Sequence, residues 1–191
     1  MEIPTFKMVL NPDDEGLGLK LMSVVDNPAI MVTWAKFNEQ EIKLSIQDED
    51  QRIVFGPALI PDLPIKRSIM GETFFVSIDR ENILQTAIKF QKDNLANKID
   101  ENHSQQVLSG ITIFETFVTN ENRVTLVKGF ESLPMGTWFI GAKVKNDDIW
   151  GKAKRGELNG FSIDGLFSFK QAEDLTEKDI RSITREILNK L

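Results

Sequence analysis

A single histidine limits the chemistry that this chain can perform. Its 191 residues include His103 as the only imidazole, and they contain no cysteine and no tyrosine. Histidine is the side chain whose ordinary pKa lies near neutrality, so general base catalysis by an imidazole would have to use His103. The absence of cysteine excludes a disulfide framework, a thiol nucleophile and a zinc finger, and one histidine cannot form a two-histidine metal site. A hydroxyl nucleophile within hydrogen-bond reach of His103 is the catalytic arrangement that these residues allow.

Ser162 stands out among the many serines and threonines because of its local sequence. It lies in the segment Asn159–Gly165 (NGFSIDG), as a polar residue within an apolar predicted strand. Strand alternation puts Ser162 on the face opposite Phe161 and Ile163, and Gly160 would allow a substrate or another backbone to approach closely. The spacing differs from the G-x-S-x-G nucleophile elbow. On these grounds alone, a half-exposed strand serine is the simpler interpretation.

Other motifs give no sign of a cofactor or a metal. Gly16-Leu17-Gly18 lacks the third glycine of a dinucleotide fingerprint and the Gly-Lys-Ser/Thr of a P-loop. Asp48-Glu49-Asp50 lacks the spacing and the central glycine of an EF-hand. We therefore expect a turn at each of these places, with no cofactor and no metal ion.

The elements that would position His103 and Ser162 are mainly strands. Short apolar–polar alternation predicts eight of them, at 19–25, 41–46, 52–60, 73–77, 107–118, 124–128, 137–145 and 160–169. Helices are predicted from Asp79 to about Leu95, after Asn146 as far as Gly156, and from Thr176 to Leu191. The order is not the regular βαβα of a parallel sheet, so we expect a mostly β, antiparallel barrel or sandwich with peripheral helices.

Composition indicates one soluble intracellular domain. The net charge of −6 argues against nucleic acid as the main partner. No apolar run approaches the roughly 20 residues that span a bilayer, and the N-terminus lacks the pattern of a signal peptide. We expect a barrel domain over residues 1–171, followed by an amphipathic C-terminal helix over 172–191 that either packs on the barrel or pairs with a second copy.

Seven blocks in the chain, taken in order, resemble a known family. They are VVDNPAI at 24–30, RIVFGPALIPD at 52–62, PIKR at 64–67, NHS at 102–104, IFET at 113–116, LPMGTW at 133–138 and GELNGFSIDG at 156–165. Together they resemble the prohead, or capsid maturation, proteases of tailed bacteriophages, and in particular the XkdF-like branch.

This resemblance implies a serine endopeptidase. The fold would be similar to that of herpesvirus assemblins, a closed and mostly antiparallel β-barrel surrounded by helices. The nucleophile of the family's Gly-Phe-Ser motif maps onto Ser162, and the general base maps onto His103. The substrates would be phage scaffold and major capsid protein segments, and self-cleavage is a further expectation. The enzyme would act in the cytoplasm of the bacterial host, inside the assembling prohead. The alternative is an inactive protease fold that serves as a structural or scaffolding component of the particle.

The third member of the site is open at this point. Herpesvirus assemblins use a second histidine, which this chain lacks. The resemblance points instead to an acidic residue, and Glu115 in the acidic block is the first candidate. Twelve residues of continuous strand would span about 40 Å, so Glu115 could meet His103 only if the chain turns, for example at Ser109-Gly110. Asp164 is the rival because it shares a strand face with Ser162. A two-residue Ser–His dyad is the remaining alternative.

Overall fold

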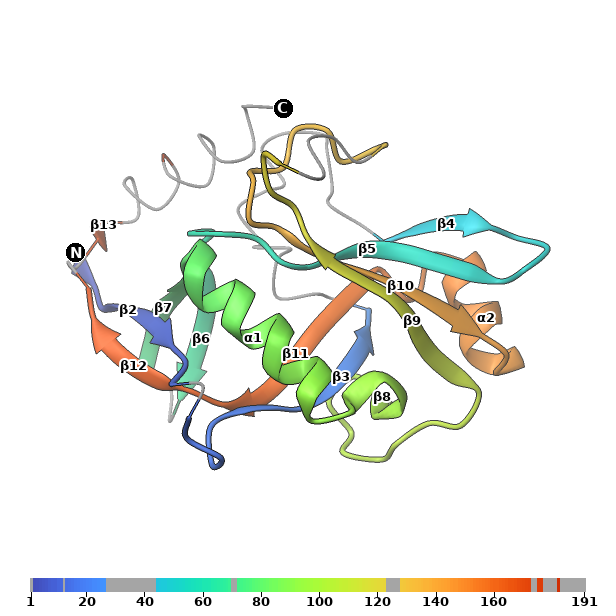
Figure 1. The fold of residues 1–191 in the computed structure, drawn as a ribbon, viewed down its shortest axis with the longest axis horizontal. Helices are drawn as coiled ribbons and strands as arrows, with labels where there is room; N and C mark the ends of the chain where they lie inside the picture. The colour runs from blue at the N-terminus through green and yellow to red at the C-terminus, as the bar shows by residue number, and fades with distance from the viewer. Residues whose placement is uncertain are drawn as a thin grey trace.

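The computed structural model describes residues 2–11, 13–26, 44–69, 72–122, 128–172, 175–176 and 182. These residues form mostly β-strands, accompanied by two α-helices and one short 3-10 helix (Figure 1). The strands are β1 (Glu2–Ile3), β2 (Thr5–Val9), β3 (Gly18–Val25), β4 (Ser45–Asp48), β5 (Ile53–Leu59), β6 (Ile65–Ile69), β7 (Glu72–Ile78), β8 (Ile99–Glu101), β9 (Ile111–Val118), β10 (Trp138–Val144), β11 (Gly160–Leu166), β12 (Ser168–Gln171) and β13 (Leu175–Thr176). The helices are α1 (Arg80–Lys92), η2 (Leu95–Asn97) and α2 (Asp147–Lys154).

A three-stranded sheet combines the start, the middle and the end of the chain. Its order is β11-β3-β8, with β11 antiparallel to β3 and β3 parallel to β8. A parallel pair needs a long crossover connection, and here four strands and α1 lie between β3 and β8. The sheet therefore brings residues far apart in the sequence onto neighbouring strands.

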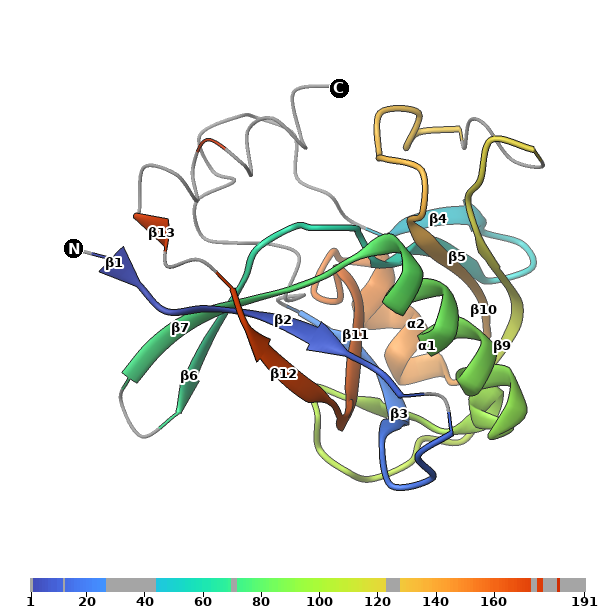
Figure 2. The ribbon, with the colours of Figure 1, turned by 60° about the vertical axis from the view of Figure 1, so that its left-hand side comes forward.

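Three further sheets surround this one. The sheet β4-β5-β10-β9 is antiparallel throughout, and the sheet β12-β2-β7-β6 contains a second parallel pair, β2 with β7. A two-stranded ribbon pairs β1 with β13, at the N-terminal end of the chain (Figure 2). The ribbon joins residues 175–176, at the start of the expected C-terminal appendage, to the first strand of the chain.

The helices begin where their capping residues predict. The Asp79 carboxylate accepts the Asn82 backbone N–H at 2.9 Å, and Asn146 caps α2 in the same way through the N–H of Ile149. Helix α1 packs against β3, β9 and β10 and buries Ile83 and Phe90 completely. The predicted helix start at Asp79 and the short helix after Asn146 are thus confirmed.

The main core lies between α1 and the sheets. Its fully buried members include Met22 of β3, Ile99 of β8, Trp138 and Ile140 of β10, and Phe161 of β11. Residues of β3, β8 and β11 alternate between this core and the opposite face of the three-stranded sheet, as strand geometry requires. The opposite face of that sheet carries the polar residues described below.

The expected closed antiparallel barrel is corrected in two respects. The described strands pair as four separate sheets, none of which closes on itself, and two of the pairs are parallel. Sequence alternation cannot reveal these parallel pairs, since they depend on which distant strands become neighbours. The predicted helix from Thr176 to Leu191 lies almost entirely outside the described residues, as does most of the predicted strand at 124–128, so both stay predictions.

Candidate active site

Ser162 lies on β11 with its side chain turned away from the main core. Its neighbour Phe161 is 1% exposed and belongs to that core, so alternation directs Ser162 to the other face of the sheet. Across the antiparallel pair, Ser162 is the direct partner of Ser23 on β3. Ser162 is only 5% exposed and Ser23 is fully buried, so neither is a half-exposed strand serine.

The loop after β8 carries His103 over this face of the sheet. Asn102, His103 and Gln105 all have positive φ angles, between 50° and 62°. Non-glycine residues rarely adopt this conformation, which costs of order 1–3 kcal/mol each and persists where surrounding contacts enforce it. Such contacts are present, because the Asn102 N–H donates to the Val24 carbonyl at 3.0 Å and the Asn102 side chain accepts the Asp26 N–H at 3.1 Å.

The two ring nitrogens of His103 each contact a serine hydroxyl. Nε2 lies 3.1 Å from Ser162 Oγ, and Nδ1 lies 3.0 Å from Ser23 Oγ. The imidazole thus bridges the two neighbouring strands β11 and β3. A neutral imidazole in this position can take the proton of the Ser162 hydroxyl at Nε2 if its own proton is on Nδ1. The arrangement is suited to activating Ser162 as a nucleophile.

Asp100 extends the same row onto the third strand. It is the register partner of Ser23 in the parallel β3–β8 pair and is fully buried. Its Oδ2 accepts the Gln105 backbone N–H at 2.7 Å, whereas Oδ1 has no hydrogen-bond partner among the described residues. Ser23 and Asp100 were not predicted from the sequence, although Ser23 shows the signal that marked Ser162, a polar residue in an apolar strand.

Neither acidic candidate for the third position is hydrogen-bonded to His103. Glu115 is an exposed residue of β9 and pairs with Gly141 of β10, in the four-stranded sheet. The chain does turn at Gly110, but β9 then follows β10 and carries Glu115 into that other sheet. Asp164 accepts a hydrogen bond from the side-chain amide of Gln105. Ser23, and neither carboxylate, contacts Nδ1 of His103.

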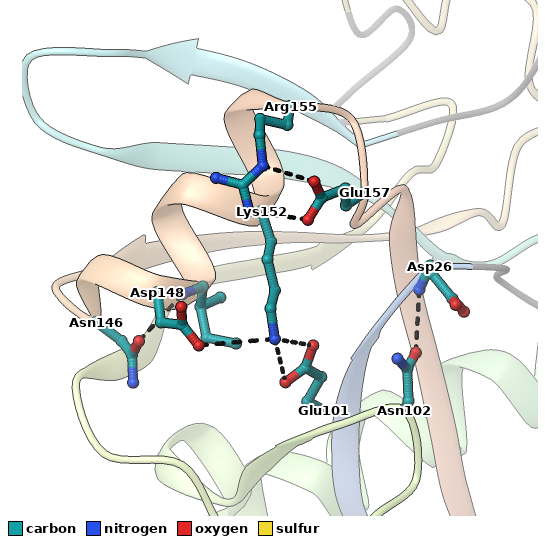
Figure 3. Close-up of polar contacts among 9 residues, drawn as sticks. Asp26, Glu101, Asn102, Asn146, Asp148, Lys152, Arg155 and Glu157 are labelled. Carbon is teal, nitrogen blue, oxygen red and sulfur yellow. Dashed lines mark hydrogen bonds and ion pairs between the residues drawn. The ribbon is translucent and has the colours of Figure 1, made fainter.

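Helix α2 contacts the end of β8, just before residues 102–105, which we call the histidine loop. Lys152 forms an ion pair with Glu101 at 2.8 Å and a longer one with Asp148 at 3.7 Å (Figure 3). The hydrogen bond to Glu101 raises the pKa of Lys152 above its ordinary value of 10.5. This ion pair fixes the residue two positions before His103, next to the strained part of the loop.

A cavity of about 260 Å³ lies beside β11, just beyond Ser162. Its walls are mainly apolar, and its one cation is Arg67 of β6. Burial lowers the pKa of the Arg67 guanidinium, and no ion pair to Arg67 is found in the part of the chain that the structure describes. The lining residues are Met8, Arg67, Phe74, Val76, Ile163, Asp164, Gly165, Phe167 and Phe169.

The described residues contain no group of three or more histidine, cysteine or acidic residues arranged to hold a metal ion. No helix within the described ranges is long and apolar enough to cross a membrane.

Comparison with known proteins identifies the family. The family model described as "Putative phage serine protease XkdF" matches residues 41–170, a range that includes His103 and Ser162 and begins after Ser23. Comparisons with curated proteins and with solved structures gave no match. The resemblance to XkdF-like phage proteases is thereby confirmed. Because the match covers more than half of its 191 residues, the chain belongs to the XkdF family of phage serine proteases.

Proposed function

We propose that the chain is a serine endopeptidase in which Ser162 is the nucleophile and His103 the general base. The observation that carries this proposal is the 3.1 Å contact between His103 Nε2 and Ser162 Oγ. That distance is within the hydrogen-bond reach that a nucleophile and its base require. Membership of a phage serine protease family supports the same chemistry.

The proposed reaction follows from these two roles. The Ser162 hydroxyl attacks the peptide carbonyl carbon while its proton moves to Nε2 of His103. The resulting imidazolium gives that proton to the leaving amine, and an acyl-enzyme on Ser162 remains. A water molecule, deprotonated in turn by Nε2, attacks the acyl carbonyl, and the proton returns to Ser162 as the acid product leaves.

The proposed substrates are scaffold and major capsid protein segments in the assembling phage prohead, within the cytoplasm of the host. Self-cleavage and self-association belong to the same proposal. The phage family supports this setting in general terms. The Arg67 cavity adds a chemical preference, because a cation without an ion-pair partner among the described residues, set among mainly apolar side chains, favours a segment with an acidic residue next to an apolar one. Asp164, the carboxylate of the same lining, would compete with that acidic residue for Arg67. Arg155 offers no comparable site, because its guanidinium is bound by Glu157 at 2.6 Å.

The role of Arg67 can be tested with a matched pair of variants. We expect Arg67→Gln to raise KM for an acidic peptide substrate by about 10- to 100-fold with little change in kcat, because a charge-assisted hydrogen bond to substrate contributes about 1.5–3 kcal/mol. Arg155→Gln is the control, since its guanidinium is engaged by Glu157. Equal KM values for the two variants would remove Arg67 from the substrate site.

The activity itself is tested with a fluorophosphonate, which phosphonylates activated serines as fluoride leaves. Labelled wild-type protein should be digested and the modified peptide identified, and Ser162→Ala should take up no label. In a second arm, each form is co-expressed with its scaffold and capsid proteins, where only the wild type should cut them. Absence of both labelling and cleavage in the wild type would favour the alternative, an inactive protease fold with a structural role.

A further inference from the structure

The direction of the hydrogen bonds at His103 decides whether the ring can act as a base. Heavy-atom distances do not reveal on which nitrogen a neutral imidazole carries its proton. If Ser23 donates to Nδ1, the ring proton is on Nε2, and Nε2 has no lone pair for the Ser162 proton. If Nδ1–H donates to Ser23 Oγ, Nε2 is free to accept. The proton of the Ser23 hydroxyl therefore needs another acceptor.

Asp100 provides the acceptor that suits this requirement. Ser23 and Asp100 are register partners on adjacent parallel strands, which lie about 4.8 Å apart and direct such partners to the same face. Both residues are fully buried, and Asp100 Oδ1 has no partner among the described residues. A buried carboxylate oxygen without a hydrogen bond is costly, and a small shift that brings the Ser23 hydroxyl within hydrogen-bond distance of Oδ1 would remove that cost.

We propose that Asp100 is a positioning residue that acts through Ser23 to fix the tautomer of His103. This inference rests on the proposed function and adds to it a row that crosses three strands. In this row Ser162 donates to Nε2, Nδ1–H donates to Ser23, and Ser23 donates to Asp100 Oδ1. The negative charge of Asp100, transmitted through one hydroxyl, also stabilises the imidazolium that forms during the reaction.

The other charged groups near the histidine loop make contacts that do not involve Ser23. Asp164 of β11 accepts from the Gln105 side chain, and Glu101 of β8 pairs with Lys152 of α2. Asp26, at the end of β3, meets the loop through its backbone N–H. No carboxylate is hydrogen-bonded to Ser23 in the part of the chain that the structure describes, Asp100 included. We assign the role to Asp100 because it is the register partner of Ser23 on the adjacent strand and keeps a buried oxygen without a partner among those residues.

The variant Asp100→Asn makes a directional prediction. The Gln105 N–H requires an oxygen at the position of Oδ2, so the introduced amide must turn its NH₂ group toward Ser23. Ser23 then accepts from this amide and donates its own proton to Nδ1. We expect the neutral imidazole to change from the Nδ1–H tautomer in the wild type to the Nε2–H tautomer in the variant.

The single histidine makes this change directly measurable. Two-bond ¹H–¹⁵N correlation spectra of ¹⁵N-labelled protein, recorded at about pH 8.5, some two units above the ordinary histidine pKa, contain ring signals of His103 alone. Asp93→Asn is the matched control, a carboxylate-to-amide change at the end of α1, where Asp93 pairs with Lys89. The same tautomer in the wild type and in Asp100→Asn would overturn the inference.

A second variant keeps the test valid if Asp100→Asn does not fold. Ser23→Ala removes the hydroxyl that links the ring to Asp100, and we expect it to lose the preference for Nδ1–H. Retention of that preference in Ser23→Ala would also overturn the inference. Both variants should lower the rate of fluorophosphonate labelling about 100-fold, within the range that general base catalysis contributes.

The two proposals fail in distinguishable ways. If the wild type is not labelled at Ser162 but the tautomer reverses in Asp100→Asn, the row exists and the protease function is wrong. If the wild type is labelled and Asp100→Asn shows an unchanged tautomer with an unchanged labelling rate, the protease function stands and the role of Asp100 is wrong.

Discussion

Two sheets of this protein carry rows of side chains with opposite chemistry on the face that points away from the main core. Across β5, β10 and β9, the rings of Phe55, Phe139 and Phe117 stack with centroid distances of 5.4 Å and 5.6 Å. Across β11, β3 and β8, the corresponding row consists of Ser162, Ser23 and Asp100. Phe139 and Phe117 are register partners, whereas Phe55 is the partner of Gly141 and reaches Phe139 diagonally. Three neighbouring strands therefore support an apolar stack on one face in one sheet and a polar row of direct partners in the other.

The comparison separates stability from function. An aromatic row gains burial and ring contacts, each pair contributing about 0.5–1.5 kcal/mol beyond its buried area. A polar row gains little on burial and requires every donor and acceptor to be satisfied. In the second row one carboxylate oxygen is left without a partner among the described residues, and the loop above it is strained. Such features cost stability, and they concentrate at functional sites, where the mechanism makes use of them.

The largest expected effect comes from Ser162→Ala, which removes the hydroxyl of the polar row on its edge strand β11. We expect Ser162→Ala to lower hydrolysis more than 1,000-fold, because the nucleophile is lost, while the free energy of unfolding changes by about 1 kcal/mol or less. Peptide hydrolysis and urea unfolding of the same preparations measure the two effects. A loss of stability as large as that of a core variant would mean that Ser162 mainly supports the fold.

The reciprocal test truncates the centre of the aromatic row. Phe139 is 1% exposed, so Phe139→Ala should lower the free energy of unfolding by about 3–5 kcal/mol. At a temperature well below its unfolding midpoint, folded Phe139→Ala should still react with fluorophosphonate at nearly the wild-type rate. If its labelling rate fell as far as its stability, the two rows would be coupled.

Much of the fold could be predicted from local patterns. Short runs rich in β-branched and aromatic residues marked strands such as β3, β5, β7 and β10, and the capping residues Asp79 and Asn146 mark the helix starts. Short strands escaped prediction, since β8 has only three residues and β1 only two, too few for any periodicity. Strand pairing escaped it as well, because the parallel β3–β8 pair depends on a long crossover.

A site residue could be predicted from the sequence only where its residue type or its local sequence set it apart. His103 could be singled out because no other imidazole exists, and Ser162 because of its surroundings and the family resemblance. Ser23 carried the same polar-in-apolar signal but had no reason to be linked to His103, eighty positions away in the chain. Asp100 could not be assigned at all, since its position beside Ser23 is a consequence of strand register.

A smaller effect is expected from the ion pair that supports the polar row from α2. Because hydrogen bonding to Glu101 raises the pKa of Lys152 above 10.5, the contribution of this pair is fully present below pH 10.5 and is lost as the pH rises through the folded-state value. We expect the unfolding temperature of the wild type to fall across this alkaline range. Lys152→Met should lack the part of this fall that is due to the ion pair, and fluorophosphonate should label it a few-fold more slowly at neutral pH.

The matched control for this prediction is Lys154→Met on the same helix. Lys154 lies 3.7 Å from Glu49 and makes no contact with the histidine loop among the described residues. Lys154→Met should show the same fall of the unfolding temperature at alkaline pH as the wild type, and it should label at the wild-type rate. Identical alkaline profiles for the two variants would show that the Glu101 ion pair does not hold the loop.

The smallest expected effect is that of Glu115→Gln, which tests whether the site uses residues of one sheet or of both. Glu115 lies on β9 at the exposed surface of the sheet that carries the aromatic row, and its cross-strand partner is Gly141. Since Nδ1 of His103 contacts Ser23, Glu115→Gln should change kcat/KM less than twofold and leave the imidazole tautomer unchanged. A loss of 100-fold or more would mean that β9 moves to the imidazole when substrate binds, and that the site draws on both sheets. Comparison with Asp100→Asn, an equally conservative change in the polar row, therefore decides which carboxylate serves His103.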